Sequence, residues 1–419
     1  MALRTITEME SAPKWEQFQA QAQETFDWQQ MRCRLVTPIY GGGTVSAKPD
    51  ENMPVRAAAI RGQLRFWWRL LAKHKRTWDL QKKSLRQAEF ALWGGMEEEG
   101  MAGKVFLRVC DCTFNGRKKW GKEALPLYTE YAPSLSDTLS YVLFPARPEK
   151  GNPPSICLFK EGLEWTLQWR FAPSVSDEQK RQVEETLRWW VNFGGIGART
   201  RRGCGAFEVL LNQATENVKQ IAKPLSEQEV KAAGCHLVQR KHTSSEAVKV
   251  WKDGVEKLRD FRQKPHVGRN PPSSSAAHGV PAGRSRWPEP DALRRLSGKH
   301  HVNHAPEHPA GNIFPRGMFG MPIIFHFVGA GEPGDSTLKP VGYERMSSPL
   351  IIRPLHNGDG QWQAGALLLP HKGWSALAVE LANSREVKLW DNKQAEHIRP
   401  LRETDGGDPL SAFLDYFKK

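Results

Sequence analysis

The stretch that most restricts the fold is residues 176–211, where a helical pattern runs into a glycine-rich loop and then into a strand. SDEQKRQVEETLRWWVNF (176–193) has the period of a helix, and Ser176, with Glu178 nearby, is suited to cap its first turn. FGGIGARTRRGCGAF (193–207) follows, with five glycines, three arginines and no acidic residue. AFEVLL (206–211) is rich in β-formers and predicts the closing strand of an α+β unit.

The segments before this stretch supply the rest of that unit. MRCRLVTPI (31–39) alternates as a strand does and enters Gly41–Gly43, and RAAAIRGQLRFWWRLLAKHK (56–75) has helical periodicity. A second helical segment near 80–92, a strand at 103–114 and a strand at 138–144 or 163–171 come next. The order β-α-β-β-α-β predicts a ferredoxin-like fold, whose four-stranded sheet is also that of the RNA recognition motif.

The second half of the chain has a looser pattern. HLVQRKH (236–242) predicts a strand and residues 244–261 a helix, whereas residues 266–285 are rich in Pro, Gly and Ser and predict a mobile loop. Strand patterns return at 321–327, 348–355 and 366–370. At 419 residues the chain can form two domains. We expect one at 1–215, with the glycine-rich loop at 194–205, and an α+β domain at 216–419 with a flexible insertion at about 264–290.

The net charge of +14 is concentrated in three places. Residues 54–76 hold seven Lys or Arg, residues 194–207 hold three and residues 261–288 hold five, and none of these segments contains an acidic residue. The rest of the chain is close to neutral. This distribution indicates a polyanionic partner, and nucleic acid is the leading candidate.

The helix at 56–75 separates its charges from its apolar residues. Its cations recur every four residues on one stripe, and Ile60, Leu64, Trp67 and Leu71 lie on an adjacent face that can pack on a sheet. Because no acid lies in reach along the sequence, phosphates would relieve the repulsion between these cations. Trp67 and Trp68 could stack on bases, but a place in the core is the better interpretation. The candidate RNA contacts of this segment are Arg56, Arg61, Arg65, Arg69, Lys73 and His74.

The glycine-rich loop suits an anion as well. Glycines allow positive φ and bring backbone N–H groups close to a phosphate, and arginines add charge-assisted hydrogen bonds. No GK[ST] follows, and Thr200 stands where a dinucleotide fingerprint needs its third glycine, so nucleotide-cofactor binding is disfavoured. The alternative is a glycine turn that only crosses the sheet edge. The candidate RNA contacts are Gly194, Gly195, Gly197, Arg199, Thr200, Arg201, Arg202 and Gly203.

The sequence gives little support for a bound metal, a bound cofactor or contact with a membrane. The six cysteines form no CxxC pair, so we expect reduced, mostly buried thiols. His300, His301, His304 and His308 suggest a metal at first sight, but Pro306 breaks a helix there and a polar loop is favoured. We expect no metal and no cofactor. No apolar run has the length of a membrane span or the character of a secretory signal, so we expect a cytoplasmic protein without membrane contact.

Several of these motifs together resemble a known family. FGGIGARTRRGCGAF resembles the glycine-rich signature of the RAMP superfamily of CRISPR proteins. TPIYGGG (37–43) and IRGQLRFWWRLLA (60–72) resemble the first RAMP subunit of the type III-B, or Cmr, effector complex. So do RSRWPEP (284–290), FPRGMFGMPIIFHF (314–327) and RMSSPLIIRP (345–354).

The resemblance implies two ferredoxin-like RAMP modules, with long loop insertions in the second. It also implies a place at the end of the complex where the 3′ portion of the guide pairs with the 5′ portion of the target. The glycine-rich loop and the basic helix would then lie near RNA, together with Arg284 and Arg286. The implied partners are the crRNA guide, the target RNA and other Cmr subunits.

Two residues, Asp50 and His74, are candidates for a catalytic role. In related RAMP subunits an aspartate in the loop after the first strand takes part in metal-dependent target cleavage, and Asp50 lies in that loop here. A loop aspartate is more often a turn or capping residue. His74 is the best-placed imidazole for metal-free cleavage of repeat RNA, although a phosphate contact is the favoured role. We therefore expect a non-catalytic RNA-binding subunit. The alternatives are an endoribonuclease acting on target or CRISPR repeat RNA and a free-standing RNA chaperone-like binder.

Overall fold

The structure is a computed structural model, and it describes most of the chain. The described residues are 28–75, 78–80, 82–96, 100–148, 156–271, 283–381, 385–404 and 407–419. Part of the predicted insertion at 264–290, residues 272–282, lies outside them. Beside that gap the chain is paired, because Asn270 N donates to Arg284 O at 2.8 Å and Gly283 N donates to Asn270 O at 3.0 Å.

A four-stranded antiparallel sheet organises the first half, in the order β5-β7-β1-β8. Met31, Cys33 and Leu35 of β1 are each at most 1% exposed, while the arginines between them face outward. This alternation places one face of the sheet in the core, because successive side chains on a strand point to opposite faces. The four strands are β1 (Gln29–Leu35), β5 (Val105–Phe114), β7 (Leu163–Phe171) and β8 (Phe207–Val209).

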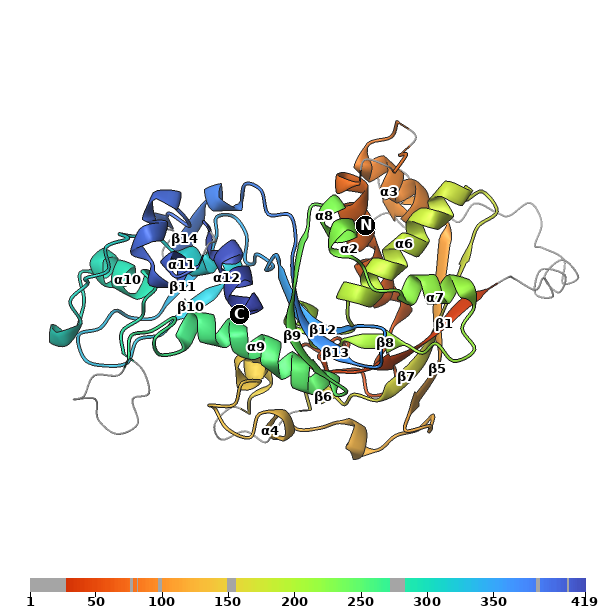
Figure 1. Cartoon of the computed structure of the whole chain (residues 1–419), viewed down its shortest axis with the longest axis horizontal. Coiled ribbons are helices and arrows are strands. Elements are labelled where there is room, and N and C mark those ends of the chain that lie inside the picture. The colour runs from red at the N-terminus through yellow and green to blue at the C-terminus, as the bar shows by residue number, and fades with distance from the viewer. Residues whose placement is uncertain are drawn as a thin grey trace, which may run out of the picture.

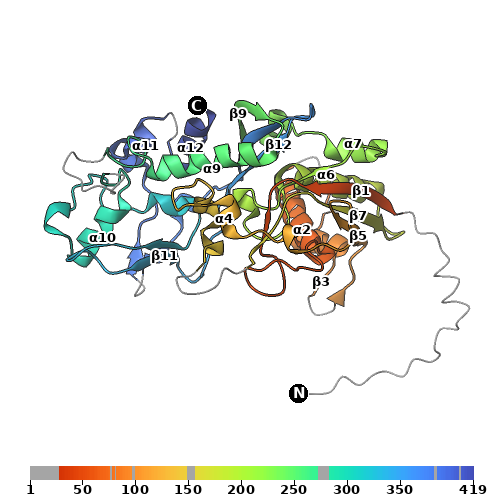
Figure 2. The same cartoon turned by 90° about the horizontal axis from the view of Figure 1, so that it is seen from below.

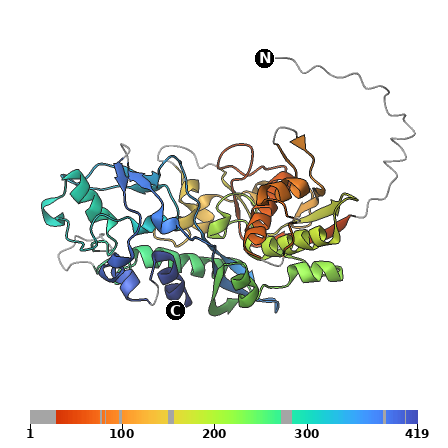
Figure 3. The same ribbon diagram turned by 90° about the horizontal axis from the view of Figure 1, so that it is seen from above.

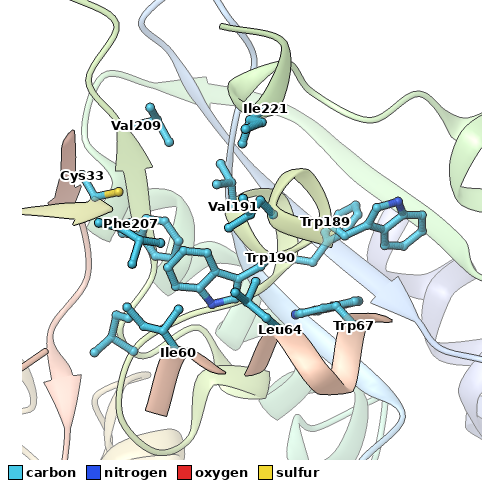
Figure 4. Packing of buried hydrophobic residues seen from close by; sticks show 14 of the residues in the cluster. Cys33, Ile60, Leu64, Trp67, Trp189, Trp190, Val191, Phe207, Val209 and Ile221 are labelled. Atoms are coloured by element: carbon cyan, nitrogen blue, oxygen red, sulfur yellow. The ribbon is translucent and has the colours of Figure 1, made fainter. Parts of the chain in front are cut away.

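Two long helices, α2 (Ala57–His74) and α6 (Asp177–Phe193), lie side by side on this sheet (Figures 1 and 3). Ser176 caps α6 as predicted, and Gln179, rather than Glu178, completes the capping box. In the core, Trp190 of α6 packs on Phe207 of β8 with ring centroids 4.5 Å apart (Figure 4). The predicted helices and the α+β class are therefore confirmed.

One of the two alternative strand predictions is wrong. Residues 163–171 form β7, but within 138–144 the chain forms the short helix α5 (Ser140–Leu143). Asp137 Oδ1 accepts the Leu139 N–H at 3.0 Å, and the Ser140 hydroxyl donates to the carbonyl of Asp137 at 2.7 Å. These local side-chain bonds favour a turn over an extended strand.

The second half contains two separate sheets. One has the order β12-β13-β9 and carries helices α9 (Ala247–Gln263) and α12 (Pro409–Lys418), and the other has the order β10-β11-β14-β15. A ferredoxin-like module has one four-stranded sheet, so the described residues differ from that prediction. The strands are β9 (His236–Ser244), β10 (Ile323–Phe325), β11 (Ser336–Pro340), β12 (Leu350–His356), β13 (Trp362–Leu368), β14 (Val379–Leu381) and β15 (Arg385–Val387).

The two halves share a core. Ile351, Leu355 and Leu367 of β12 and β13 belong to the same buried cluster as the first sheet. Val218 and Ile221 of α7 (Glu216–Ala222) belong to it as well. Figures 1 and 2 show β9, β12 and β13 between the two ends of the molecule. The boundary at 215/216 stays a prediction.

Shorter elements connect these parts. Among the described residues, no helix has the length and apolar character that crossing a membrane requires. The remaining helices and strands are β2 (Ile39–Tyr40), α3 (Leu85–Trp93), β3 (Gly95–Met96), β4 (Gly100–Met101), α4 (Tyr128–Tyr131), β6 (Leu158–Phe159), α7 (Glu216–Ala222), α8 (Glu227–Ala232), α10 (Glu289–Ser297) and α11 (Arg399–Arg402).

Candidate nucleic-acid interface

The glycine-rich loop forms a seam between the two halves of the molecule. Arg202 donates to the carbonyl oxygens of Leu350 at 3.0 Å and Phe319 at 2.9 Å, and Arg201 donates to the carbonyl of Ser348. Burial lowers the pKa of Arg202 to about 10. Because the acceptors are neutral carbonyl groups, these bonds hold the arginines in place without cancelling their charge.

An arginine of the second half also contacts the glycine-rich loop and its neighbours. Arg353 of β12 is 3% exposed and donates to the carbonyls of Gly194 at 2.6 Å, Val191 at 3.1 Å and Phe207 at 3.1 Å. Burial lowers its pKa to about 9. This residue joins the end of α6, the loop and β8 to β12, and sequence reasoning missed it because its partners are far away along the chain.

The glycines of the loop are packed by this protein itself. A Cβ on Gly203 would lie 2.5 Å from the Trp251 side chain and 2.9 Å from the Ile352 carbonyl oxygen, and one on Gly194 would lie 2.2 Å from the Trp190 side chain. Gly195 is also buried, whereas Gly197 is only partly so. The N–H groups of Ile196 and Gly205 donate to carbonyls of this chain at 2.9 and 2.8 Å. The sequence prediction that these glycines open the loop to a phosphate is therefore not supported by their surroundings.

The basic stripe of α2 has partners that the sequence did not indicate. Arg61 donates to the Val105 carbonyl at 2.7 Å. Glu89 of α3 accepts from Arg65 at 2.7 Å and from Arg69 at 2.6 Å, and it is 5% exposed. The prediction that no acid lies in reach is wrong, because α3 folds back against α2. Trp67 and Trp68 are each 1% exposed, which confirms their place in the core.

A different face of α2 meets the glycine-rich loop. Ala59, Gly62, Gln63 and Phe66 share this face, as the spacing of three and four residues requires. Between it and the loop lies a hollow of about 260 Å³. Thr200, Arg201 and Ile351 complete its lining, together with the largely buried Trp67 and Phe193. Sequence reasoning missed Gln63 and Phe66, although a glycine in the middle of a helix was a signal.

The remaining predicted contacts near the loop have mixed exposure. Arg56, at the N-cap of α2, donates to the Gly42 carbonyl, and Lys73 is exposed near the other end of the helix. Burial, with a smaller contribution from Lys73, lowers the pKa of His74, so its imidazole is neutral at pH 7. Arg199 has a φ of 57° and places its guanidinium 4.8 Å from the Phe144 ring.

Arg284 and Arg286 are not brought to this site. They lie in the second half, just before α10, which Figure 1 shows in the half of the molecule away from α2. Arg284 pairs with Asp291 at 3.0 Å. Arg286 is 8% exposed and donates to the Asn270 side chain at 3.1 Å. Their internal partners give both side chains a role in the packing of the second half.

Asp50 and the candidate metal-binding residues His304 and His308 have hydrogen-bond partners within this protein. Asp50 Oδ1 accepts the N–H groups of Asn52 at 3.0 Å and Met53 at 2.9 Å, which is the turn role that the sequence favoured. His304 pairs with Glu332 at 2.5 Å, and His308 Nε2 lies 3.0 Å from the Arg286 carbonyl oxygen. Within the part of the chain that the structure describes, no three His, Cys, Asp or Glu residues are grouped for a metal ion. All six cysteines are free, and four of them are buried.

Comparisons with known proteins found similarities in sequence and in structure. A family model described as the RAMP superfamily matches residues 32–208. The CRISPR system Cmr subunit Cmr1-2 of Pyrococcus furiosus is 24% identical over 181 residues, which are 42% of this chain and 90% of that protein. The crystal structure of Cmr1 from Pyrococcus furiosus in its apo form has a TM-score of 0.45 at 14% identity, covering 82% of this chain and 88% of that one.

A second solved structure is the type III-B Cmr-β complex bound to cognate target RNA and AMPPnP. One of its chains has a TM-score of 0.44 at 11% identity, covering 93% of this chain and 98% of that one. The family match begins within β1, ends within β8, and includes α2 and the glycine-rich loop. The sequence similarity to the RAMP superfamily therefore lies between residues 32 and 208 of this chain.

Proposed function

We propose that this chain is a non-catalytic RNA-binding subunit of a type III-B (Cmr) RNA-guided effector complex that serves antiviral defence. It holds the 3′ part of the crRNA guide and the target RNA paired with it, and it packs against other Cmr subunits in the cytoplasm. The RAMP family match and the similarity to the Cmr1-2 subunit of Pyrococcus furiosus support this assignment.

One observation carries the proposal: a group of cations around α2 and the glycine-rich loop has no acidic partner. Among the described residues, no ion pair within 4.0 Å involves Arg56, Lys73, Arg199, Arg201 or Arg202. Their positive charge is therefore available to an external anion, and the RNA backbone offers a row of negatively charged phosphates. We call Arg56, Lys73, Arg199 and Arg201, with the exposed face of α2 between them, the α2–loop surface.

The shape of this surface suits a nucleic-acid backbone. Ala58, Ala59 and Gly62 of α2 are exposed and small, so a ribose-phosphate chain can approach the helix closely. Contacts to phosphates position RNA without reading its sequence. That property fits a subunit that must accept any guide. The partly buried Arg202 supports the loop through its bonds to the Leu350 and Phe319 carbonyls.

We also propose that the second half contains a reduced module of the same kind. Its elements follow the order β9, α9, β12, β13, α12, and its sheet has the order β12-β13-β9. This is the ferredoxin-like arrangement with three strands in place of four. The small sheet β10-β11-β14-β15 and α10 are then the insertions.

The binding test compares two double variants in the assembled complex. Arg56→Gln with Lys73→Gln removes two cations of the α2–loop surface, and Lys219→Gln with Lys249→Gln removes two exposed cations elsewhere. We expect the first pair to reduce the slope of log affinity against log salt by about 0.7 per lost contact, and the second pair to leave it unchanged. Equal slopes for the two pairs would contradict the proposal.

The absence of an active site has its own test. Complexes that carry Asp50→Ala or His74→Ala should cut target RNA at the parental rate, because Asp50 is engaged in a turn and His74 has no second catalytic group that the sequence or the described residues supply. Metal-dependent cleavage lost with Asp50→Ala would favour a nuclease. Chelator-resistant cleavage lost with His74→Ala would favour a repeat-processing enzyme. Full RNA binding without any copurifying subunit would favour the free-standing binder.

A further inference from the structure

We propose that the hollow beside Gly62 receives one unstacked nucleobase of the bound RNA. The hollow is formed by Ala59, Gly62, Gln63 and Phe66 of α2 and by Thr200 and Arg201 of the glycine-rich loop. This inference rests on the proposed function, since it assigns a base-binding subsite within the α2–loop surface.

Gly62 is the first reason to expect a ligand there. A glycine inside a helix costs about 1 kcal/mol relative to alanine, so it needs a local cause. A Cβ on Gly62 would meet no atom of the described residues within 4 Å. Gly254, in the middle of α9, differs: its Cβ would lie 2.9 Å from Ile352 Cγ2, so packing explains it. No contact in the part of the chain that the structure describes explains Gly62, and an external group that comes close to the helix does.

The size of the hollow fits a base. A cavity of roughly 150 Å³ is enough to hold a benzene ring. The hollow is about 260 Å³, which leaves room for a two-ring purine. It opens to solvent beside the exposed residues of α2, so a base can enter it from RNA that lies along the α2–loop surface.

The chemistry of the lining also fits a base better than a phosphate. A nucleobase has flat apolar faces and a polar edge, and aromatic rings and guanidinium planes stack on such faces. Phe66 supplies the ring, while the Gln63 amide and the Thr200 hydroxyl can pair with the polar edge. The Arg201 guanidinium lies 5.2 Å from the Phe66 ring and already donates to the Ser348 carbonyl. It is thus held as a fixed flat group at the rim.

Gly62 permits a sharp experiment, because Gly62→Leu fills the hollow while it improves the helix. Gly62→Ala is the matched control, since it gives the same kind of helix gain and adds only one methyl group. We expect both variants to melt at or above the temperature of the parent. A loss of binding in Gly62→Leu is then not a loss of folding.

The readout is target-RNA affinity of the assembled complex with guide RNAs that each carry one abasic site. With the parental protein, we expect one abasic position in the 3′ part of the guide to weaken binding about tenfold, which is the size of one base stack. With Gly62→Leu, the intact guide should bind about tenfold more weakly, and the abasic position should have no further effect. Gly62→Ala should keep the parental pattern.

Three outcomes would overturn the inference. The first is that no abasic position in the guide changes the target-RNA affinity of the parental complex. The second is that the Gly62→Leu complex binds target RNA as tightly as the parent. The third is that the loss of affinity in Gly62→Leu matches the effect of a methylphosphonate at one guide position and of no abasic site. The last result would mean that the hollow holds the RNA backbone. If the parental complex loses no RNA affinity when Arg56 and Lys73 are replaced by glutamine, the proposed function fails instead, and the two failures are distinguishable.

Discussion

The arginines of the seam differ from Arg65 and Arg69 of α2 in the groups that hold them. Arg353 and Arg202 are held by carbonyl oxygens, so their charge persists inside the molecule. Arg65 and Arg69 share the carboxylate of Glu89, so part of their charge is cancelled. The comparison teaches that a basic segment marks a binding surface only where the fold leaves its charge unpaired. The positive field of this region comes from the loop side more than from the stripe.

The largest effect should come from the seam. Arg353→Met removes the donor to four buried carbonyl groups. Each carbonyl costs about 1–3 kcal/mol when it is left unpaired, and this cost is partly offset because a charge is no longer buried. We expect a net loss of about 3 kcal/mol in the free energy of unfolding, measured by urea denaturation. Arg385→Met is the control, because Arg385 is exposed and donates to one carbonyl at 2.7 Å. Equal unfolding midpoints for the two variants would show that Arg353 contributes no more to stability than an exposed arginine.

The next effect concerns the acid between the α2 arginines. Glu89→Gln should lower stability by about 2 kcal/mol, because two hydrogen bonds to a charged group are weakened. It should also raise RNA affinity at low salt and steepen the salt slope, since two cations lose their counter-charge. Filter binding over a salt series measures both. Unchanged affinity would mean that this stripe faces away from RNA.

A smaller effect is expected at Arg61. Its hydrogen bond to the Val105 carbonyl predicts a loss of about 1 kcal/mol for Arg61→Met, with no change in the salt slope of RNA binding. For the same reason, replacing Arg61 and Arg65 together by glutamate should lower the melting temperature. If the variant with Arg61→Glu and Arg65→Glu kept its melting temperature but captured target RNA weakly, Arg61 would be a contact to RNA.

The smallest effect should be the pH dependence at His74. Its pKa is lowered in the folded state by burial and by Lys73, so the unfolded chain takes up the proton first as the pH falls. Stability should therefore decrease as the pH falls through 6.5, and His74→Asn should remove that part of the decrease. Thermal melts between pH 8 and pH 5 test this. A steeper decrease in the variant would show that the shift has the opposite sign.

The sequence predicted the elements whose pattern is local. α6 was found because an apolar period of 3.6 follows a Ser176 cap, and β1 because its side chains alternate. The segment at 138–144 failed because bonds of Asp137 and Ser140 to nearby backbone overrode an apolar run.

The site was harder to predict because its decisive contacts join distant parts of the chain. Glu89 reaches Arg65 across 24 positions, and Arg353 reaches the Gly194 carbonyl across 159 positions. The glycine-rich loop was singled out from its composition, but the groups that approach its glycines belong to the protein itself. The sequence shows a glycine at position 62 within a helix, but its proposed role depends on the hollow beside it, which only the structure shows.

The most direct test of the central claim is photocrosslinking of the assembled complex. A photoreactive amino acid at Ala58, on the exposed face of α2, reports what covers the α2–loop surface. The same group at Val302, which is 81% exposed in the second half, serves as the control. The account predicts a crosslink from position 58 to guide or target RNA and none from position 302. A crosslink from position 58 only to a neighbouring protein subunit, or RNA captured only from position 302, would contradict it.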